Sequence, residues 1–284
     1  KGLRMTYGIN SILHTPTTIH YTMWYEKLLE LNIVPESLIR KAIRSQLANK
    51  LKIESAKDPG LRADFVRQLK EGPIAVNTQD ANEQHYEVPA EFFHLVLGKY
   101  LKYSCGYWPE GVEDLDKSEE AMLDLYVKRT DIQSGQMVLD LGCGWGSFSL
   151  YAAQKFPDSQ FMAVSNSKVQ KADIEKAAKQ RGVKNLSFIN SDINEFNADP
   201  IFDRIVSIEM FEHVLNYEKL FEKVSSWLKA QGKLFVHIFC HHDYAYPFEA
   251  DSESSWMAKH FFSGGTMPSE RLFYEFKDNL KITQ

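Results

Sequence analysis

Strand-like and helix-like segments alternate regularly through the second half of the chain. Short apolar runs, typical of buried strands, recur at intervals that leave room for one helix between them. Such alternation is typical of βαβ units, in which parallel strands form one sheet and helices cover its faces. The sequence therefore predicts an α/β protein with a doubly wound sheet, whose strands occupy 137–141, 161–165, 186–190, 204–208 and 233–239.

A long stretch precedes this alternating part. From Pro35, apolar residues follow a helical period and basic residues line the other side, which is typical of an amphipathic helix packed on a larger domain. Asp58-Pro59-Gly60 interrupts the pattern, and the aromatic-rich segment 73–117 is irregular. We therefore expect an N-terminal helical and aromatic cap region over 1–117 and a ligand-binding core over 118–284.

The composition narrows the class of protein. The 284 residues include 33 Lys and Arg against 38 Asp and Glu, a net charge of −5, whereas nucleic-acid binders usually carry a basic excess. Three cysteines, odd in number and far apart, argue against a disulfide scaffold and favour a reducing compartment. Because no apolar run approaches ~20 residues and no secretory-signal pattern opens the chain, we expect a cytoplasmic protein without nucleic acid or stable membrane association.

A glycine-rich loop follows the first predicted strand. Asp140-Leu141-Gly142-Cys143-Gly144-Trp145-Gly146 comes directly after an apolar run and directly before a helix, the context that a nucleotide-type loop requires. Glycine at 142 and 144 allows a tight turn and close approach of a ligand to the backbone. A dinucleotide loop reads G-x-G-x-x-G and binds pyrophosphate, which Asp140 would repel. A carboxylate suits a cationic amino group instead, so the loop favours S-adenosylmethionine.

Polar residues after the second and third strands extend this ligand site. Asn166 and Gln170 lie four residues apart and share a face if a helix starts there, and we expect them to bind the ribose hydroxyls. Asp192 and Ile193 follow the third strand. We expect the carboxylate to bind the adenine amino group and the isoleucine to cover the ring; a helix cap is the alternative for Asp192.

An acidic cluster follows the fourth predicted strand. If this segment turns helically, Glu209 lies three residues from Glu212 and four from His213, which makes the three side chains neighbours. Ligands of open α/β sheets bind at this carboxyl edge. Two carboxylates can hold a cationic amine and raise the proton affinity of an imidazole. We therefore expect these three residues to be catalytic.

Another group of polar residues surrounds the end of the fifth strand. Adjacent His241 and His242 point in different directions, and no Cys-x-x-Cys pair completes a set of ligands. We expect no metal there, although the segment contains His237, Cys240, His241, His242 and Asp243.

Five motifs, in this order, resemble a known family: YSCGYW, VLDLGCGWGS, SNSKVQ, IEMFEHV and the stretch from HIFCH to TMPS. The chain resembles the cyclopropane-fatty-acid-synthase-like methyltransferases over residues 35–276, and within them the plant coclaurine and pavine N-methyltransferase branch. The resemblance implies a Rossmann-like class I methyltransferase sheet with an N-terminal helical extension. It also implies S-adenosylmethionine as co-substrate and methylation of a small aromatic amine of the benzylisoquinoline type.

The resemblance implies roles for further residues. Tyr103 and Ser104 would close over the methyl donor. An aromatic pocket would suit a flat amine and would stabilise the sulfonium through cation–π contact, although core packing is the alternative for each aromatic residue. The candidates for its walls are Tyr86, Phe93, Trp108, Phe261 and Phe262.

Two alternative functions stay open. A lipid enzyme that makes cyclopropane or methyl-branched acyl chains would use the basic N-terminal helix to dock on an anionic membrane. A donor-binding protein without turnover would fit the end of the chain at Gln284, because the family continues through a segment that completes the sheet and covers the substrate. We therefore expect either a shortened form with low turnover or a homodimer that completes the sheet edge, since only 272–283 has room for one further strand.

Overall fold

The computed structural model describes residues 26–76, 89–199, 201–248, 258, 262 and 264–283. The chain divides into two units, 1–52 and 53–284. The first unit contains α1 (Glu26–Glu30) and most of α2 (Glu36–Ala56), the amphipathic helix that the sequence predicts. Within the described residues, no helix is long and apolar enough to cross a bilayer.

Among the described residues of the second unit, three helices precede the sheet. Asp58 caps the first of them, accepting a hydrogen bond from the Gly60 N–H at 2.7 Å, and Asp114 caps the last, accepting from the Lys117 N–H at 2.8 Å. The middle helix lies in the segment expected to be irregular, where two turns are too few to show a period. Their bounds are α3 (Pro59–Gln68), α5 (Ala90–Val96) and α6 (Leu115–Thr130).

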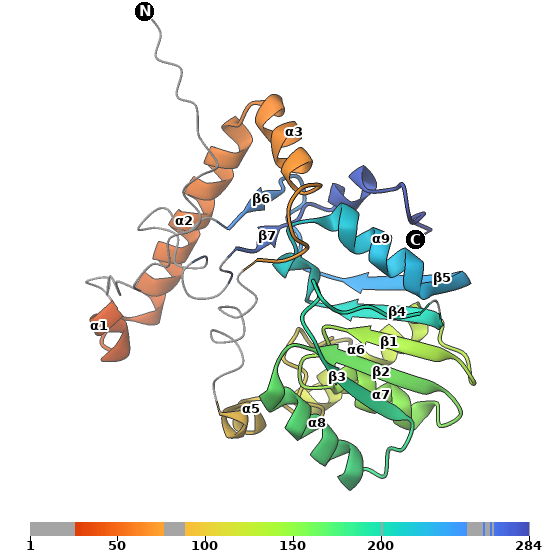
Figure 1. Ribbon diagram of the computed structural model, residues 1–284. Helices are drawn as coiled ribbons and strands as arrows, with labels where there is room; N and C mark the ends of the chain where they lie inside the picture. Colours follow the sequence, from red (N-terminus) through yellow and green to blue (C-terminus); the bar gives the residue numbers. More distant parts are fainter. Residues whose placement is uncertain are drawn as a thin grey trace, which may run out of the picture. The chain divides into compact units, whose positions relative to one another are not determined.

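The predicted sheet is confirmed. Its strands are all parallel, in the order β3-β2-β1-β4-β5 (Figure 1). The fifth strand begins earlier than expected, because its first residue pairs with Phe202 across an irregularity in the register. The strands are β1 (Met137–Leu141), β2 (Gln160–Ser165), β3 (Leu186–Asn190), β4 (Phe202–Ile208) and β5 (Leu228–His237).

Hydrophobic layers cover both faces of the sheet, because successive side chains of a strand point to opposite faces. Val138 packs with residues of α6 and α7, whereas the next residue, Leu139, packs with residues of α9. Figure 1 shows α9 beside β5, at the far end of the sheet from α8. The helices that follow the strands are α7 (Ser147–Lys155), α8 (Lys168–Gln180) and α9 (Tyr217–Trp227).

The segment after β5 forms a small antiparallel pair, β6 (Tyr246–Pro247) with β7 (Thr266–Met267). The expected room for a strand over 272–283 is not used: Leu272–Glu275 forms a 3-10 turn. Leu272 and Phe276 are buried there, and Phe276 packs on the Tyr217 ring of α9 with centroids 5.4 Å apart. This segment therefore packs on the helix and adds no strand to the sheet.

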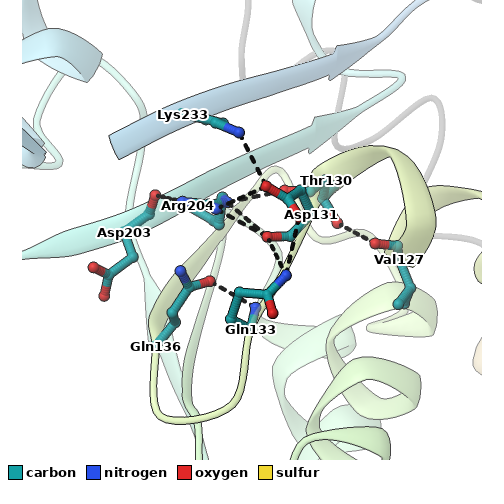
Figure 2. Close-up of polar contacts among 8 residues, drawn as sticks. All are labelled: Val127, Thr130, Asp131, Gln133, Gln136, Asp203, Arg204 and Lys233. Carbon is teal, nitrogen blue, oxygen red and sulfur yellow. Dashed lines mark hydrogen bonds and ion pairs between the residues drawn. The ribbon is translucent and has the colours of Figure 1, made fainter. Parts of the chain in front are cut away.

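A polar network joins the start of the sheet to the end of α6 (Figure 2). Arg204, only 7% exposed, donates from Nε to the Thr130 carbonyl and from Nη2 to the Asp131 carbonyl, each at 2.9 Å. The Asp131 carboxylate accepts from Lys233 Nζ at 3.0 Å and from Gln133 Nε2 at 2.9 Å. Asp131 has φ 52°, so the guanidinium secures a left-handed helix end whose carbonyls would otherwise lack partners.

Candidate active site

The glycine loop turns tightly at the carboxyl end of β1. Gly142, Gly144 and Gly146 all have positive φ, and the N–H groups of Gly142 and Cys143 both donate to the Val164 carbonyl at the end of β2. A Cβ at Gly144 would meet no described atom within 4 Å. The turn is therefore fixed against the sheet while the backbone at Gly144 stays accessible to a ligand, as the sequence predicts.

A cavity of about 70 Å³ lies beside this loop. Tyr103 and Ser104, which the resemblance implies close over the donor, line it together with the loop and with Glu209 of the predicted acidic cluster. The other lining residues come from the segment just before Tyr103, from the loop, from α6 and α7, and from the ends of β1 and β4: Leu101, Lys102, Leu123, Tyr126, Asp140, Gly142, Cys143, Gly144, Trp145, Ser147, Phe148 and Ile208.

Asp140 contributes a buried carboxyl group to this cavity. It is 2% exposed, and its Oδ2 accepts a hydrogen bond of 2.6 Å from Ser149 Oγ of α7. Burial raises the pKa of Asp140 to about 7, against the opposing effect of the Ser149 hydrogen bond. Asp140 is therefore only partly ionised at neutral pH, whereas the sequence analysis treats it as a carboxylate.

The residues after β2 are arranged differently from the expectation. Ser167 caps α8, its Oγ accepting from the Gln170 N–H at 3.3 Å, so the helix starts at Lys168 and Asn166 precedes it. The premise that Asn166 and Gln170 share a helix face is wrong. Gln170 is completely buried; its Oε1 accepts from Ser165 Oγ at 2.7 Å, and its Nε2 has no partner among the described residues.

The loop after β3 holds Asp192 in a tight turn. Its Oδ1 accepts from the Asn194 N–H at 2.8 Å and from Asn194 Nδ2 at 2.9 Å. Asn194 Oδ1 in turn accepts from the Ile74 N–H at 2.9 Å, so this loop is tied to the segment that follows α3. The side chain of Ile193 packs partly buried against the main core.

The acidic cluster forms after β4, but not as a regular helix. Glu209 has φ 52°, and its N–H donates to the His237 carbonyl at 2.8 Å. A 3-10 turn, Phe211–His213, follows. Glu212 is 1% exposed, and its Oε2 has no hydrogen-bond partner within the described part of the chain. Burial, together with the neighbouring Glu209 carboxyl, raises the pKa of Glu212 well above its usual range.

His213 faces an aromatic cluster formed by residues after β5. Its ring lies 5.3 Å from that of Phe262, which stacks on Phe248 at 5.0 Å and contacts Phe239 at 5.2 Å. A Cβ on Gly265 would lie 2.8 Å from the Glu212 carbonyl oxygen, so the segment beside Phe262 packs tightly on the acidic turn. Phe262 is the one predicted wall residue that the described structure brings to the acidic cluster.

The other predicted wall residues lie elsewhere. Phe93 is buried between Trp145 and Tyr103, with ring centroids at 4.6 and 5.1 Å, so it backs the glycine loop. Trp108 is 56% exposed. Tyr86 and Phe261 lie outside the described residues.

The structure also brings together polar residues that the sequence analysis missed. Buried Lys102 and Tyr126 line the cavity. Nearby, the Sγ of Cys105, a carboxylate oxygen of Glu209 and a ring nitrogen of His237 lie within 4.8 Å of one another. His237 therefore groups with Cys105 and with Glu209, which lines the cavity. His241 Nδ1 accepts the N–H groups of Asp243 and Tyr244, each at 3.0 Å. Two features of the sequence could have indicated these residues: Lys102 lies in the apolar run just before YSCGYW, and His237 lies at the end of a strand.

Comparisons with known proteins extend this description. The family model "Mycolic acid cyclopropane synthetase" matches residues 75–283. The (S)-coclaurine N-methyltransferase of Thalictrum flavum subsp. glaucum is 38% identical over 262 residues, which cover 90% of this chain and 73% of that protein. The cyclopropane-fatty-acyl-phospholipid synthase of Escherichia coli (strain K12) is 29% identical, with 87% of this chain and 60% of the relative covered.

A solved structure agrees closely with the fold. Coclaurine N-methyltransferase, bound to N-methylheliamine and SAH, matches with a TM-score of 0.85 at 36% identity, covering 91% of this chain and 76% of that one. The parallel sheet with helices on both faces is the Rossmann-like sheet of class I methyltransferases, as expected. The chain belongs to the mycolic acid cyclopropane synthetase family, as its motifs predict.

Proposed function

We propose that this chain is an S-adenosylmethionine-dependent N-methyltransferase that acts on a small aromatic amine of the benzylisoquinoline type. The names of its N-methyltransferase relatives support the activity. One structural observation carries the choice of an amine: a buried carboxyl, Glu212, lies beside a second carboxyl, Glu209, at the ligand edge of the sheet. Such a pair favours a substrate that carries a positive charge before the reaction, as an ammonium group does and an alkene does not.

The residues around the glycine loop fit the methyl donor. The unpartnered Nε2 of buried Gln170 is a donor that a ribose hydroxyl would satisfy, and the open backbone at Gly144 leaves room for close approach. We assign Asn166 and Gln170 to the ribose and Asp192 and Ile193 to the adenine. The bound donor supplies a methyl group already activated on a sulfonium. This role therefore covers Gly142, Gly144, Asp140, Tyr103, Ser104, Asn166, Gln170, Asp192 and Ile193.

The protein's contribution to the chemistry is positioning and proton acceptance. The neutral amine must approach the methyl carbon in line with the bond that breaks, and positioning of this kind contributes ~7–11 kcal/mol. Glu209 holds the ammonium form of the substrate, and the His213 ring, or Glu212 Oε2 when that carboxyl is ionised, accepts its proton, which is worth ~10²–10⁴-fold. Phe262 offers an aromatic face beside His213, which suits a flat substrate. The division of the chain into an N-terminal cap region over 1–117 and a donor-binding core over 118–284 belongs to the same proposal.

The test is a turnover assay with a labelled methyl donor. A benzylisoquinoline secondary amine and vesicles of an unsaturated phospholipid are offered in parallel, and donor affinity is measured by calorimetry with SAH. We expect methylated amine and no label in lipid. Label in lipid alone would establish the lipid enzyme, and SAH binding with no product from either substrate would establish a donor-binding protein. Glu212→Gln should abolish most amine turnover, whereas Glu222→Gln, exposed on α9, is the matched control.

A further inference from the structure

Lys102 is a buried lysine at the edge of the cavity. It is 4% exposed. Its Nζ donates to Ser104 Oγ at 2.5 Å and to Tyr126 Oη at 3.1 Å, and lies 4.7 Å from the centre of the Tyr126 ring. Burial lowers the pKa of Lys102 to about 8, against the opposing charges of Cys105, Glu209 and Glu119. A buried lysine is costly unless it is paired, so its place in this site calls for a role.

The hydrogen bonds from Lys102 have a defined direction. An ammonium group only donates, so the Tyr126 oxygen accepts from it and the Tyr126 O–H remains to donate onward. The onward partner is His237 Nδ1, at 2.7 Å. If Tyr126 donates to this nitrogen, Nδ1 carries no proton and a neutral His237 carries its proton on Nε2.

This chain of hydrogen bonds ends at the acidic cluster. Glu209 Oε1 lies 3.7 Å from the same Nδ1 of His237, and the Glu209 N–H donates to the His237 carbonyl. If Nδ1 were protonated, the imidazolium would pair with Glu209 and remove its capacity to hold a substrate ammonium. Burial lowers the pKa of His237; the positive charges of Lys102 and Arg129 lower it further, whereas Glu209 raises it.

We propose that Lys102 is a positioning residue that acts through Tyr126 to keep His237 Nδ1 unprotonated, which leaves Glu209 as a free carboxylate for the substrate ammonium. This inference rests on the proposed function. It assigns a specificity role to a lysine that lies on the cavity side of the acidic cluster. The charged and titratable groups that face the chain are Cys105 and Glu119 near Lys102, Arg129 from α6, and Glu209.

The test is the pH profile of kcat/KM for the amine. Lys102→Met and Tyr126→Phe each break the chain, and each should move the acid limb upward by about one pH unit, which is about a tenfold loss on that limb. The loss should vanish above pH 9, where Lys102 of the wild type is itself neutral. Lys102→Arg keeps the charge and should restore the limb. Because the two residues act in series, the double variant should lose no more than either single variant.

Two further measurements separate this role from simpler ones. Lys128→Met, exposed on α6, is the control and should leave the limb in place. SAH affinity by calorimetry should stay within threefold in Tyr126→Phe, which keeps the hydrogen bond from Lys102 to Ser104. An unmoved limb in folded variants, or a loss confined to SAH affinity, would overturn the proposal.

Histidine-selective ¹⁵N NMR tests the same chain without turnover. At pH 7.5 we expect His237 to carry its proton on Nε2, and Tyr126→Phe to shift the proton toward Nδ1. A wild-type His237 protonated on Nδ1 would refute the proposed direction. If no amine is methylated while the expected tautomer is present, the proposed function fails but the hydrogen-bond direction stands, so the two failures are distinguishable.

Discussion

Gly142 lies directly against the side chain of Met210. A Cβ built on Gly142 would come within 2.6 Å of Met210 Cγ and 2.8 Å of Met210 Cβ. This contact joins the glycine loop after β1 to the residue that follows Glu209 after β4. The donor loop and the acidic turn therefore pack on each other with no space for a side chain between them.

Gly142→Ala should weaken donor binding. The alanine would adopt φ +81° against its preference and would also displace Met210, at ~1–2 kcal/mol for the backbone and ~1–3 kcal/mol for the overpacking. We expect SAH affinity to fall by about tenfold or more. Gly135→Ala is the matched control, because Gly135 has φ +83° and its Cβ would meet no described atom within 4 Å. If both variants lost the same SAH affinity, contact with Met210 would not explain the loss.

Glu212→Gln should separate chemistry from folding. A neutral amide of the same shape removes the buried acid, so turnover at neutral pH should fall ~10²–10⁴-fold while SAH affinity stays nearly unchanged. The loss should shrink as pH rises, since more of the amine is then already deprotonated. The melting temperature should hold or rise, because the raised pKa of Glu212 means that its charged form opposes folding. A joint loss of SAH binding and stability would instead assign Glu212 to the fold.

Asp140 should make the protein less stable as pH rises. Its pKa is about 7 in the folded chain against 3.8 as the ordinary value, so its contribution to stability is complete at acid pH and is lost as pH rises through 7. The full effect is on the order of 4 kcal/mol. We expect the wild-type melting temperature to fall between pH 5 and pH 8 and Asp140→Asn to fall less. Asp158→Asn, exposed before β2, should follow the wild type; a parallel fall in Asp140→Asn would show that Asp140 ionises freely.

Arg204→Lys should destabilise the fold without changing the site. A lysine keeps the charge but cannot donate to the Thr130 and Asp131 carbonyls together, and a lost charge-assisted hydrogen bond costs ~1.5–3 kcal/mol. We expect a lower urea midpoint with unchanged SAH affinity. Arg271→Lys, at an exposed position, serves for comparison. A wild-type midpoint in Arg204→Lys would mean that the network in Figure 2 adds little to stability.

The strands and the glycine loop were predictable because local patterns determine them. An apolar run bounded by turn residues marks a buried strand, and Gly142 and Gly144 meet a backbone requirement that no other residue meets as well. The shared helix face expected for Asn166 and Gln170 is wrong for a local reason: Ser167 caps α8, which leaves Asn166 outside the helix.

The side-chain partners were not predictable from local patterns. Tyr126 and His237 are 111 residues apart in the chain yet share a hydrogen bond, and only the packing of α6 on β5 brings them together. The aromatic residues show the same limit. Phe93 and Phe262 are both buried, but one backs the glycine loop and the other faces His213, a difference that depends on tertiary contacts alone.

The network around Arg204 has a consequence for engineering. It lies where the strands begin, whereas the glycine loop and the acidic turn lie where the strands end. Attempts to make an enzyme more heat-resistant often reduce activity, because the altered residues also serve the catalytic site. In this chain the Arg204 network lies at the amino-terminal ends of the strands, and the length of the strands separates it from the cavity. Substitutions around Asp131 and Lys233 can therefore be screened for thermal resistance with little risk to turnover.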